Sequence, residues 1–213
     1  MIKNIISQLS GHHDRTGIDP SLFQDPIASK TDWSPMARGG SNFKSAGLHQ
    51  VNDQRYEFRP SWMTKFLSMI FFVMGLLLIV FLMKKSPDSF RDYIPIGMAA
   101  IFCAAGIGTY YSSKTPIVFD RNHGYFCRSR EKPELMMDPT RLKRYAPLKR
   151  VHALQIISEY IKTKKSSYYS YELNLVLDDG SRVHVIDHGN HLALRTDAET
   201  LSKFLDKPLW DAS

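Results

Sequence analysis

The stretch Phe66–Met83, FLSMIFFVMGLLLIVFLM, holds 18 residues without a charge, and the rest of the chain is interpreted around it. As a helix rising about 1.5 Å per residue it would extend about 27 Å, close to the roughly 30 Å hydrocarbon core of a bilayer. Trp62 precedes the stretch and Lys84 and Lys85 follow it, as is typical of side chains at the two membrane interfaces. The stretch therefore predicts a membrane-spanning helix.

A second uncharged stretch, Tyr93–Tyr111, follows after a short polar break but contains few strongly apolar residues. Ala100, Ala104 and Gly108 recur every four residues, so they share one helix face and would allow a neighbouring backbone to approach closely. We expect this face to pack against the first helix or against a partner, which includes a second copy of the chain. The two stretches together predict a multi-pass membrane hairpin.

Charge and composition suggest where the two tails lie. Of the 28 Lys and Arg residues, 24 lie in the tails and three lie between the two apolar stretches, namely Lys84, Lys85 and Arg91. The two cysteines do not form a disulfide framework. We expect a multi-pass membrane protein with both termini in the cytoplasm. The predicted domains are a mostly disordered tail over 1–60, the hairpin over 61–113 and a soluble domain over 114–213.

The N-terminal tail shows no sustained helical or strand period. Met1–Leu9 could form a short amphipathic helix, although a helix of that length is marginal in water. Isolated apolar residues, Leu22, Phe23 and Trp33, are interpreted as docking points for a partner.

The C-terminal hundred residues carry β signals followed by one helical pattern, so the predicted fold class is α+β. Gly124 supplies the turn of one hairpin, and Asp178–Ser181 joins the strands of another. Leu194, Ala198, Leu201 and Leu205 have near-helical spacing. We expect five or six strands in all, among them 116–120, 125–128, 151–160, 171–177 and 182–187, and then a helix over 192–205.

This layout resembles bacterial two-span inner-membrane proteins that carry a C-terminal pleckstrin-homology-like domain. The segments that carry the resemblance are TPIVFDR at 115–121, GYF at 124–126, ALQIISEY at 153–160 and YELNLVLDDGSR at 171–182. The resemblance covers residues 66 to about 206, mostly as architecture. It implies a location in the bacterial inner membrane and a small antiparallel β domain that ends in a helix. It implies no site residues.

A cluster of cations precedes the third predicted strand. In a soluble protein with a pI of 9.4 such a cluster would suggest nucleic acid. Beside an anionic membrane face each basic group contributes about 1 kcal/mol of attraction, so lipid headgroups or a partner are the better prediction and nucleic acid is not expected. A solvated basic loop without a ligand is an equally good interpretation. The cluster consists of Arg141, Lys143, Arg144, Lys149 and Arg150.

Three histidines near the C-terminus, His184, His188 and His191, accompany Asp187 and are weak candidates for zinc ligands. Their spacing matches no established site, so surface polar residues around a turn are the favoured interpretation and no metal or cofactor is predicted.

Catalytic motifs are missing from the sequence, since it contains no nucleophile elbow, Walker loop, CxxC pair or HExxH. The sequence therefore predicts a non-enzymatic membrane protein that binds a protein partner, such as an immunity or accessory protein for a membrane-acting factor. The alternative is a module that senses or handles anionic lipid.

Overall fold

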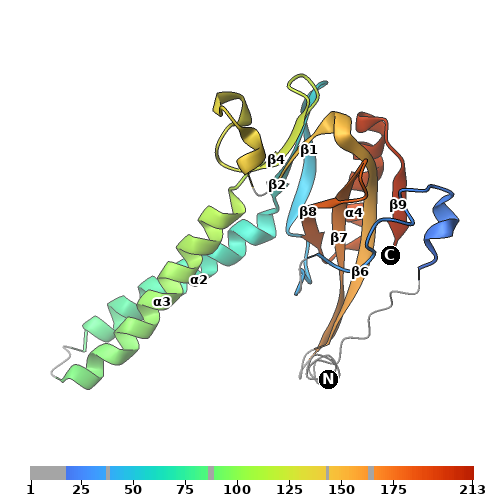
Figure 1. Ribbon diagram of the computed structural model, residues 1–213. Coiled ribbons are helices and arrows are strands. Elements are labelled where there is room, and N and C mark those ends of the chain that lie inside the picture. Colours follow the sequence, from blue (N-terminus) through green and yellow to red (C-terminus); the bar gives the residue numbers. More distant parts are fainter. Residues whose placement is uncertain (1–17, 37–38, 86–88, 143, 163–165) are drawn as a thin grey trace, which may run out of the picture. The chain divides into compact units, whose positions relative to one another are not determined.

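The computed structural model describes residues 18–36, 39–85, 89–142, 144–162 and 166–213. The chain forms two compact units, one comprising residues 60–115 and the other the remaining chain on both sides of them. The smaller unit is a pair of long apolar helices, and the larger one is a β domain with a C-terminal helix (Figure 1). The mixed α+β fold is thus confirmed.

The smaller unit consists of α2 (Trp62–Met83) and α3 (Phe90–Ser113), both long and apolar enough to cross a membrane. The side chain of Ser61 caps α2 by accepting a hydrogen bond from the backbone N–H of Thr64 at 3.2 Å. At the start of α3, the carboxylate of Asp92 accepts a hydrogen bond from the backbone N–H of Ser89 at 3.0 Å. These caps explain why each helix begins a few residues before its uncharged stretch.

Glycines allow α2 and α3 to pack closely. A Cβ added to Gly75 would lie 2.7 Å from the carbonyl oxygen of Ala99, and one added to Gly106 would lie 2.7 Å from the backbone of Ser68. The side chains of Thr109 and Ser68 are joined by a 3.1 Å hydrogen bond.

The predicted small-residue face of the second helix is not the one that contacts the first. Ala99 and Gly106 are buried against α2, whereas Ala100, Ala104 and Gly108 are exposed. An added Cβ at Gly108 would meet no atom within 4 Å. The predicted packing of this face on the first helix is therefore wrong, because the contact follows a neighbouring stripe. A partner for the face, including a second copy of the chain, stays a prediction.

The first sheet of the β domain contains five strands in the order β1-β2-β3-β4-β5. Phe58 of β2 pairs with Ile117 of β3, so the pair of helices is inserted between two neighbouring strands of one sheet. Gly124, with φ +72°, makes the turn between β3 and β4, as predicted. The strands are β1 (Ala46–Asn52), β2 (Arg55–Pro60), β3 (Ile117–Asp120), β4 (Tyr125–Arg128) and β5 (Tyr145–Pro147).

The second sheet contains four strands in the order β8-β7-β6-β9, and β9 is parallel to β6 whereas the other pairs are antiparallel. Short 3-10 helices lie at 20–23, 133–135, 139–141 and 148–150, and the second of these is η2 (Pro133–Leu135). The described residues thus form nine strands rather than the five or six expected. The remaining elements are β6 (Val151–Lys162), β7 (Ser167–Leu177), β8 (Arg182–His188), α4 (His191–Leu205) and β9 (Leu209–Ala212).

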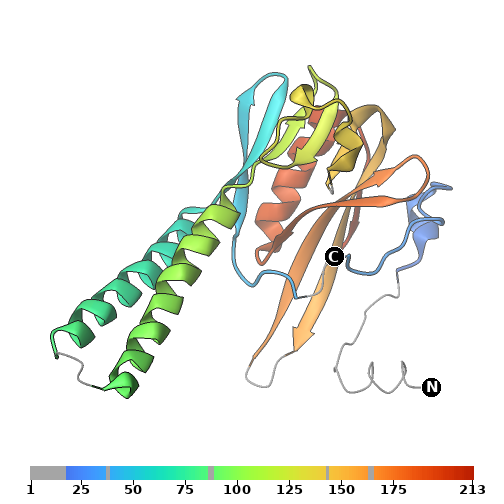
Figure 2. The same cartoon turned by 60° about the vertical axis from the view of Figure 1, so that its left-hand side comes forward.

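The main core lies between the two sheets and α4 (Figure 2). Alternate residues of each strand point into it, as period-two patterning requires. Burying side chains of this size contributes about 1.5–3 kcal/mol each, so this core is a main source of stability. Its fully buried members include Phe119, Phe126, Leu154, Ile156, Leu173, Leu175, Leu194 and Leu201.

The opposite face of the second sheet is covered by the N-terminal segment. Trp33 stacks on Phe23 at 4.9 Å and lies 5.8 Å from the ring of Trp210 on β9. Its indole N–H donates a 3.0 Å hydrogen bond to the carbonyl oxygen of Ala28. Trp33 and Phe23 therefore pack within their own domain, whereas Leu22 is exposed.

The prediction of a mostly disordered tail over 1–60 is consequently wrong for the part that the structure describes. That part packs on one sheet through Trp33 and supplies β1 and β2 to the other. The amphipathic helix predicted for residues 1–9 lies outside the described residues.

Candidate functional site

A group of charged side chains lies on the outer face of the first sheet, at the turn between β3 and β4. Asp120 ends β3, and its Oδ1 accepts a 2.9 Å hydrogen bond from the backbone N–H of His123, which fixes the turn. Arg55, which pairs with Asp120 across β2 and β3, donates from Nη1 to Oδ2 at 3.2 Å. The segment after β4 brings Glu134 to the same place.

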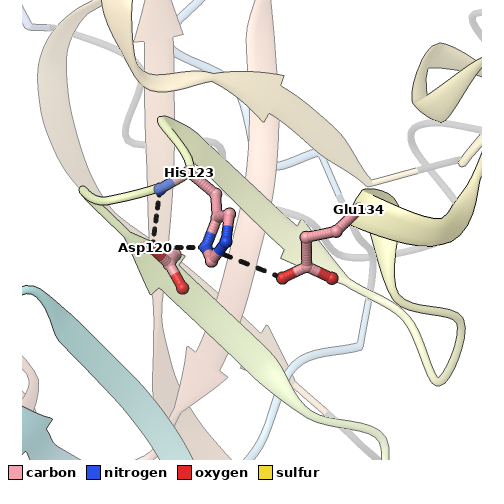
Figure 3. A group of neighbouring side chains, drawn as sticks. All are labelled: Asp120, His123 and Glu134. Atoms are coloured by element: carbon pink, nitrogen blue, oxygen red, sulfur yellow. Dashed lines mark hydrogen bonds and ion pairs between the residues drawn. The ribbon is translucent and has the colours of Figure 1, made fainter.

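Figure 3 shows the imidazole of His123 between two carboxylates. Its Nδ1 lies 3.2 Å from Oδ1 of Asp120 and 3.8 Å from Oε1 of Glu134. Asp120 is almost fully buried, whereas about half of the His123 side chain is exposed. Glu134 in turn accepts a 2.5 Å hydrogen bond from the hydroxyl of Tyr125 on β4. One exposed imidazole is thus held by two anchored carboxylates.

These contacts shift the ionisation of the group. Burial opposes charge on Asp120, but hydrogen bonds from His123 and the nearby Arg55 outweigh it and lower the pKa of that carboxyl. The hydrogen bond from Tyr125 lowers the pKa of Glu134, while burial and Glu134 raise the pKa of Tyr125. Both carboxylates are therefore charged at neutral pH.

Two pockets adjoin this group. One of about 480 Å³ lies between the β1–β2 turn at 52–55 and the β3–β4 turn at 120–123. The other, of about 450 Å³, lies between the outer sheet face and segment 129–135. Val118, Tyr125 and Cys127 form its apolar floor, and Arg55 and Glu134 contribute charges at its edge. The arrangement can bind a group that offers both apolar surface and charge.

Chemistry at these pockets is limited by the state of the nearby thiol. Cys127 is buried, and burial raises its pKa to about 11, so it stays protonated near neutral pH.

Asp120, His123 and Glu134 have the donor types of a metal site, yet Arg55 places a positive charge among them and Tyr125 already bonds Glu134. We interpret the group as an ion-pair network that shapes a binding surface.

The predicted basic cluster does not form one free surface. Arg150 lies between Asp178 and Asp179, 2.7 Å from each, at the β7–β8 turn of the second sheet. Arg141 pairs with Asp138 at 3.4 Å in a different segment. Lys149 is exposed and Arg144 is half-buried, and Lys143 lies outside the described residues.

The three predicted histidines are also used separately. His188 is buried, with Nε2 3.1 Å from the carbonyl oxygen of Ala46 and Nδ1 accepting from the backbone of Asn190. His191 stacks on Tyr171 at 4.7 Å. His184 is buried and lies 3.1 Å from Asp187, so neither His184 nor His188 is the surface residue that the sequence analysis favours.

Sequence reasoning missed the group around His123. A signal was present, since Asp120 and His123 bracket the turn predicted before Gly124 and an Asp there often accepts backbone hydrogen bonds. Arg55 lies within residues 1–60, which the sequence predicts to be a disordered tail. Glu134 lies in segment 129–135, which shows no regular helical or strand period.

The fold and the site place the chain among α+β proteins in which a pair of apolar helices is inserted into the sequence of a β domain. One sheet face of this domain carries charged side chains and two pockets. No family model matches the chain, and no curated protein is similar to it.

Proposed function

We propose that this chain is a non-enzymatic membrane protein whose β domain binds a protein partner at the pocket beside segment 129–135. The single observation that carries the proposal is the exposure of two apolar residues: Leu135, which lines this pocket and is 83% exposed, and Met137, two residues further on, which is 108% exposed. Neighbouring exposed apolar side chains beside a pocket are typical of interaction sites.

The exposed pair belongs to a held segment. Pro133 is buried, and Glu134 is bonded to Tyr125 at 2.5 Å, so η2 is fixed on the sheet directly before Met136 and Met137. A segment whose backbone is already held loses less conformational entropy on binding than a mobile one. Leu135 and Met137 are therefore suited to act as anchors for a partner.

The charges around the pocket favour a protein over lipid headgroups. Arg55, Arg130 and Lys132 are accompanied by the carboxylates of Glu131 and Glu134. An anionic bilayer would be attracted by the first three and repelled by the other two, whereas a protein segment can match both signs. Binding of anionic lipid is the alternative.

A non-enzymatic role is supported by the protonated, buried Cys127 and by the ion pairs that already occupy Asp120 and Glu134. We place the protein in the bacterial inner membrane, with α2 and α3 crossing the bilayer. Because β2 and β3 are paired, both ends of the helical pair would lie on one side, which we assign to the cytoplasm. An immunity or accessory protein fits these properties.

We also propose that the β domain is a pleckstrin-homology-like module. The packing of two sheets with α4 around one core supports this assignment.

The proposal is tested by photo-crosslinking of the full chain in cells, with the crosslinking amino acid in place of Glu131 at the pocket. We expect a discrete protein adduct that the double variant Leu135→Ser/Met137→Ser abolishes. Leu192→Ser is the matched control, because Leu192 is equally apolar and 74% exposed but lies on α4. Adducts to lipid alone, or a protein adduct that survives the double variant, would contradict the proposal.

A further inference from the structure

An irregularity in β8 changes which side chains share a face of the second sheet. Leu173 of β7 pairs with Ile186, but the next residue, Asn174, pairs with His184, so Val185 is an extra residue on β8. Such bulges re-aim side chains and are over-represented next to functional sites.

The bulge gathers three potential ligands. In a regular strand His184 and Asp187, three positions apart, would point to opposite faces. With the extra residue both lie on the face of Glu172, whose register partner is Asp187. This is the face opposite the main core, covered at this point by the N-terminal segment, since Glu172 accepts hydrogen bonds from the backbone N–H of Met36 at 3.0 Å.

The imidazole of His184 lacks hydrogen bonds although it is buried. The residue is 5% exposed, and neither ring nitrogen has a hydrogen-bond partner among the described residues. Its Nε2 lies 3.1 Å from Oδ1 of Asp187, yet the two atoms are not aligned for a hydrogen bond. Leaving such a group unpaired costs about 1–3 kcal/mol, so this imidazole calls for a ligand that the described residues do not supply.

Other polar atoms of this face are in the same condition. Within the part of the chain that the structure describes, the other buried side-chain atoms without a partner are Oδ1 of Asn174 and Oγ of Ser170. Both residues lie on β7, where they alternate with core residues, so they are on the same face of the second sheet as Glu172. Unpaired polar atoms are thus concentrated on the face that holds the three potential ligands.

We propose that Glu172, His184 and Asp187 bind a divalent cation of the zinc class. Zinc–ligand bonds of about 2.0–2.1 Å in a tetrahedral arrangement place neighbouring ligand atoms about 3.3 Å apart. The unaligned 3.1 Å approach of His184 to Asp187 has this length. All three ligand atoms lie within 4.8 Å of one another, so a shift of about 1.5 Å in the Glu172 carboxylate completes the set.

Two arginines of the described residues near the site are held by other groups. Arg182, a cation near Glu172, is bonded to Asp32 at 3.0 Å and to the carbonyl oxygen of Ser34 at 2.8 Å. Arg128 interacts electrostatically with Asp187, and its guanidinium donates a 3.3 Å hydrogen bond to the carbonyl oxygen of Val185. In these contacts both guanidinium groups are bonded to atoms outside the three potential ligands.

The bound ion would have a structural role. Glu172 already holds the N-terminal segment through Met36, so a cation on Glu172 would join that segment to β7 and β8. Folding and metal binding are then coupled, and the ion stabilises the folded domain by mass action.

The test uses the full chain, purified in detergent with any affinity tag removed, equilibrated with Zn²⁺ and freed of excess metal. We expect about one zinc ion per chain by elemental analysis and a higher unfolding temperature with zinc than with a chelator. Asp187→Asn, which keeps the shape of the side chain, should lower zinc affinity at least tenfold. His123→Gln is the matched control, because it removes the imidazole of the other His–carboxylate group, and it should bind zinc like the unmodified chain.

His184→Gln and Glu172→Gln should behave like Asp187→Asn, and tryptophan fluorescence reports whether each variant is folded. The proposal is overturned if the unmodified chain retains no zinc, or if Asp187→Asn and Glu172→Gln retain as much as it does. Ordered water would then be the partner of His184.

Discussion

Phe58 and Ile117 are paired across β2 and β3, although the whole apolar helical pair separates them in the sequence. Phe58 is buried and contacts Phe119 edge-to-face at 6.4 Å. Residues before α2, such as Phe58, and residues after α3, such as Ile117 and Phe119, therefore belong to the same hydrophobic core.

Replacing Phe58 by Ala should lower the free energy of unfolding of the β domain by about 3–5 kcal/mol, because it leaves a cavity in this core. Urea unfolding followed by tryptophan fluorescence measures the change. Val51→Ala, on exposed β1 surface, is the control and should cost less than about 0.5 kcal/mol. Equal effects of the two variants would show that β2 is not part of the folded domain.

Trp33→Ala should release the N-terminal segment from the second sheet, since Trp33 joins Phe23 to Trp210. We expect a loss of about 3 kcal/mol and much faster proteolysis between residues 18 and 36. Limited proteolysis with mass spectrometry measures the cleavage. Leu22→Ala is the control, because Leu22 is exposed, and unchanged cleavage in Trp33→Ala would contradict the packing described.

Gly106→Leu should separate α2 from α3, because its Cβ would lie 2.7 Å from the backbone of Phe72. A Ser68→Cys/Thr109→Cys pair, placed where the two hydroxyls are 3.1 Å apart, should form a disulfide in membranes when Cys103 is replaced by Ala. Gly106→Leu should abolish this crosslink, measured by gel mobility after oxidation. Gly108→Leu, where space is open, should leave the crosslink intact, and loss of it there would show that Gly108 belongs to the interface.

Asp120→Asn should destabilise the β domain in a pH-dependent way. The folded pKa of Asp120 is lowered, so its charge stabilises the fold above the unfolded pKa of about 3.9, and that contribution is lost as the pH falls through the folded pKa. The difference between the two proteins in urea midpoint should be full at pH 7 and shrink below about pH 4. A difference of the same size at pH 7 and pH 2 would rule out this role of the charge.

Much of the β domain was predictable because its strands are local patterns. Leu173, Leu175 and Leu177 alternate with residues of the opposite face, and β4 and α4 were placed to within a residue. The strands before the helical pair were not predicted, since Tyr56 and Phe58 offer only two apolar alternations and their pairing partner lies beyond α3.

The sites were predicted less completely, for physical reasons. The sequence groups His184 with Asp187 only because they are close in the chain. Glu172 joins them from another strand, and only the bulge at Val185 turns all three to one face. Bulges depend on strand pairing, which a single sequence does not display. The same holds for Arg55, which reaches Asp120 across two strands.

The insertion of the helical pair between β2 and β3 also sets an order of events during synthesis. β1 and β2 leave the ribosome first, and about 56 further residues must be translated before β3 emerges. At 5–20 residues per second this takes roughly 3–11 s, during which the edge of β2 that pairs with β3 has no native neighbour. If the helices cross a membrane as proposed, both reach the insertion machinery within this interval, so the β domain is completed only after the second helix has been synthesised.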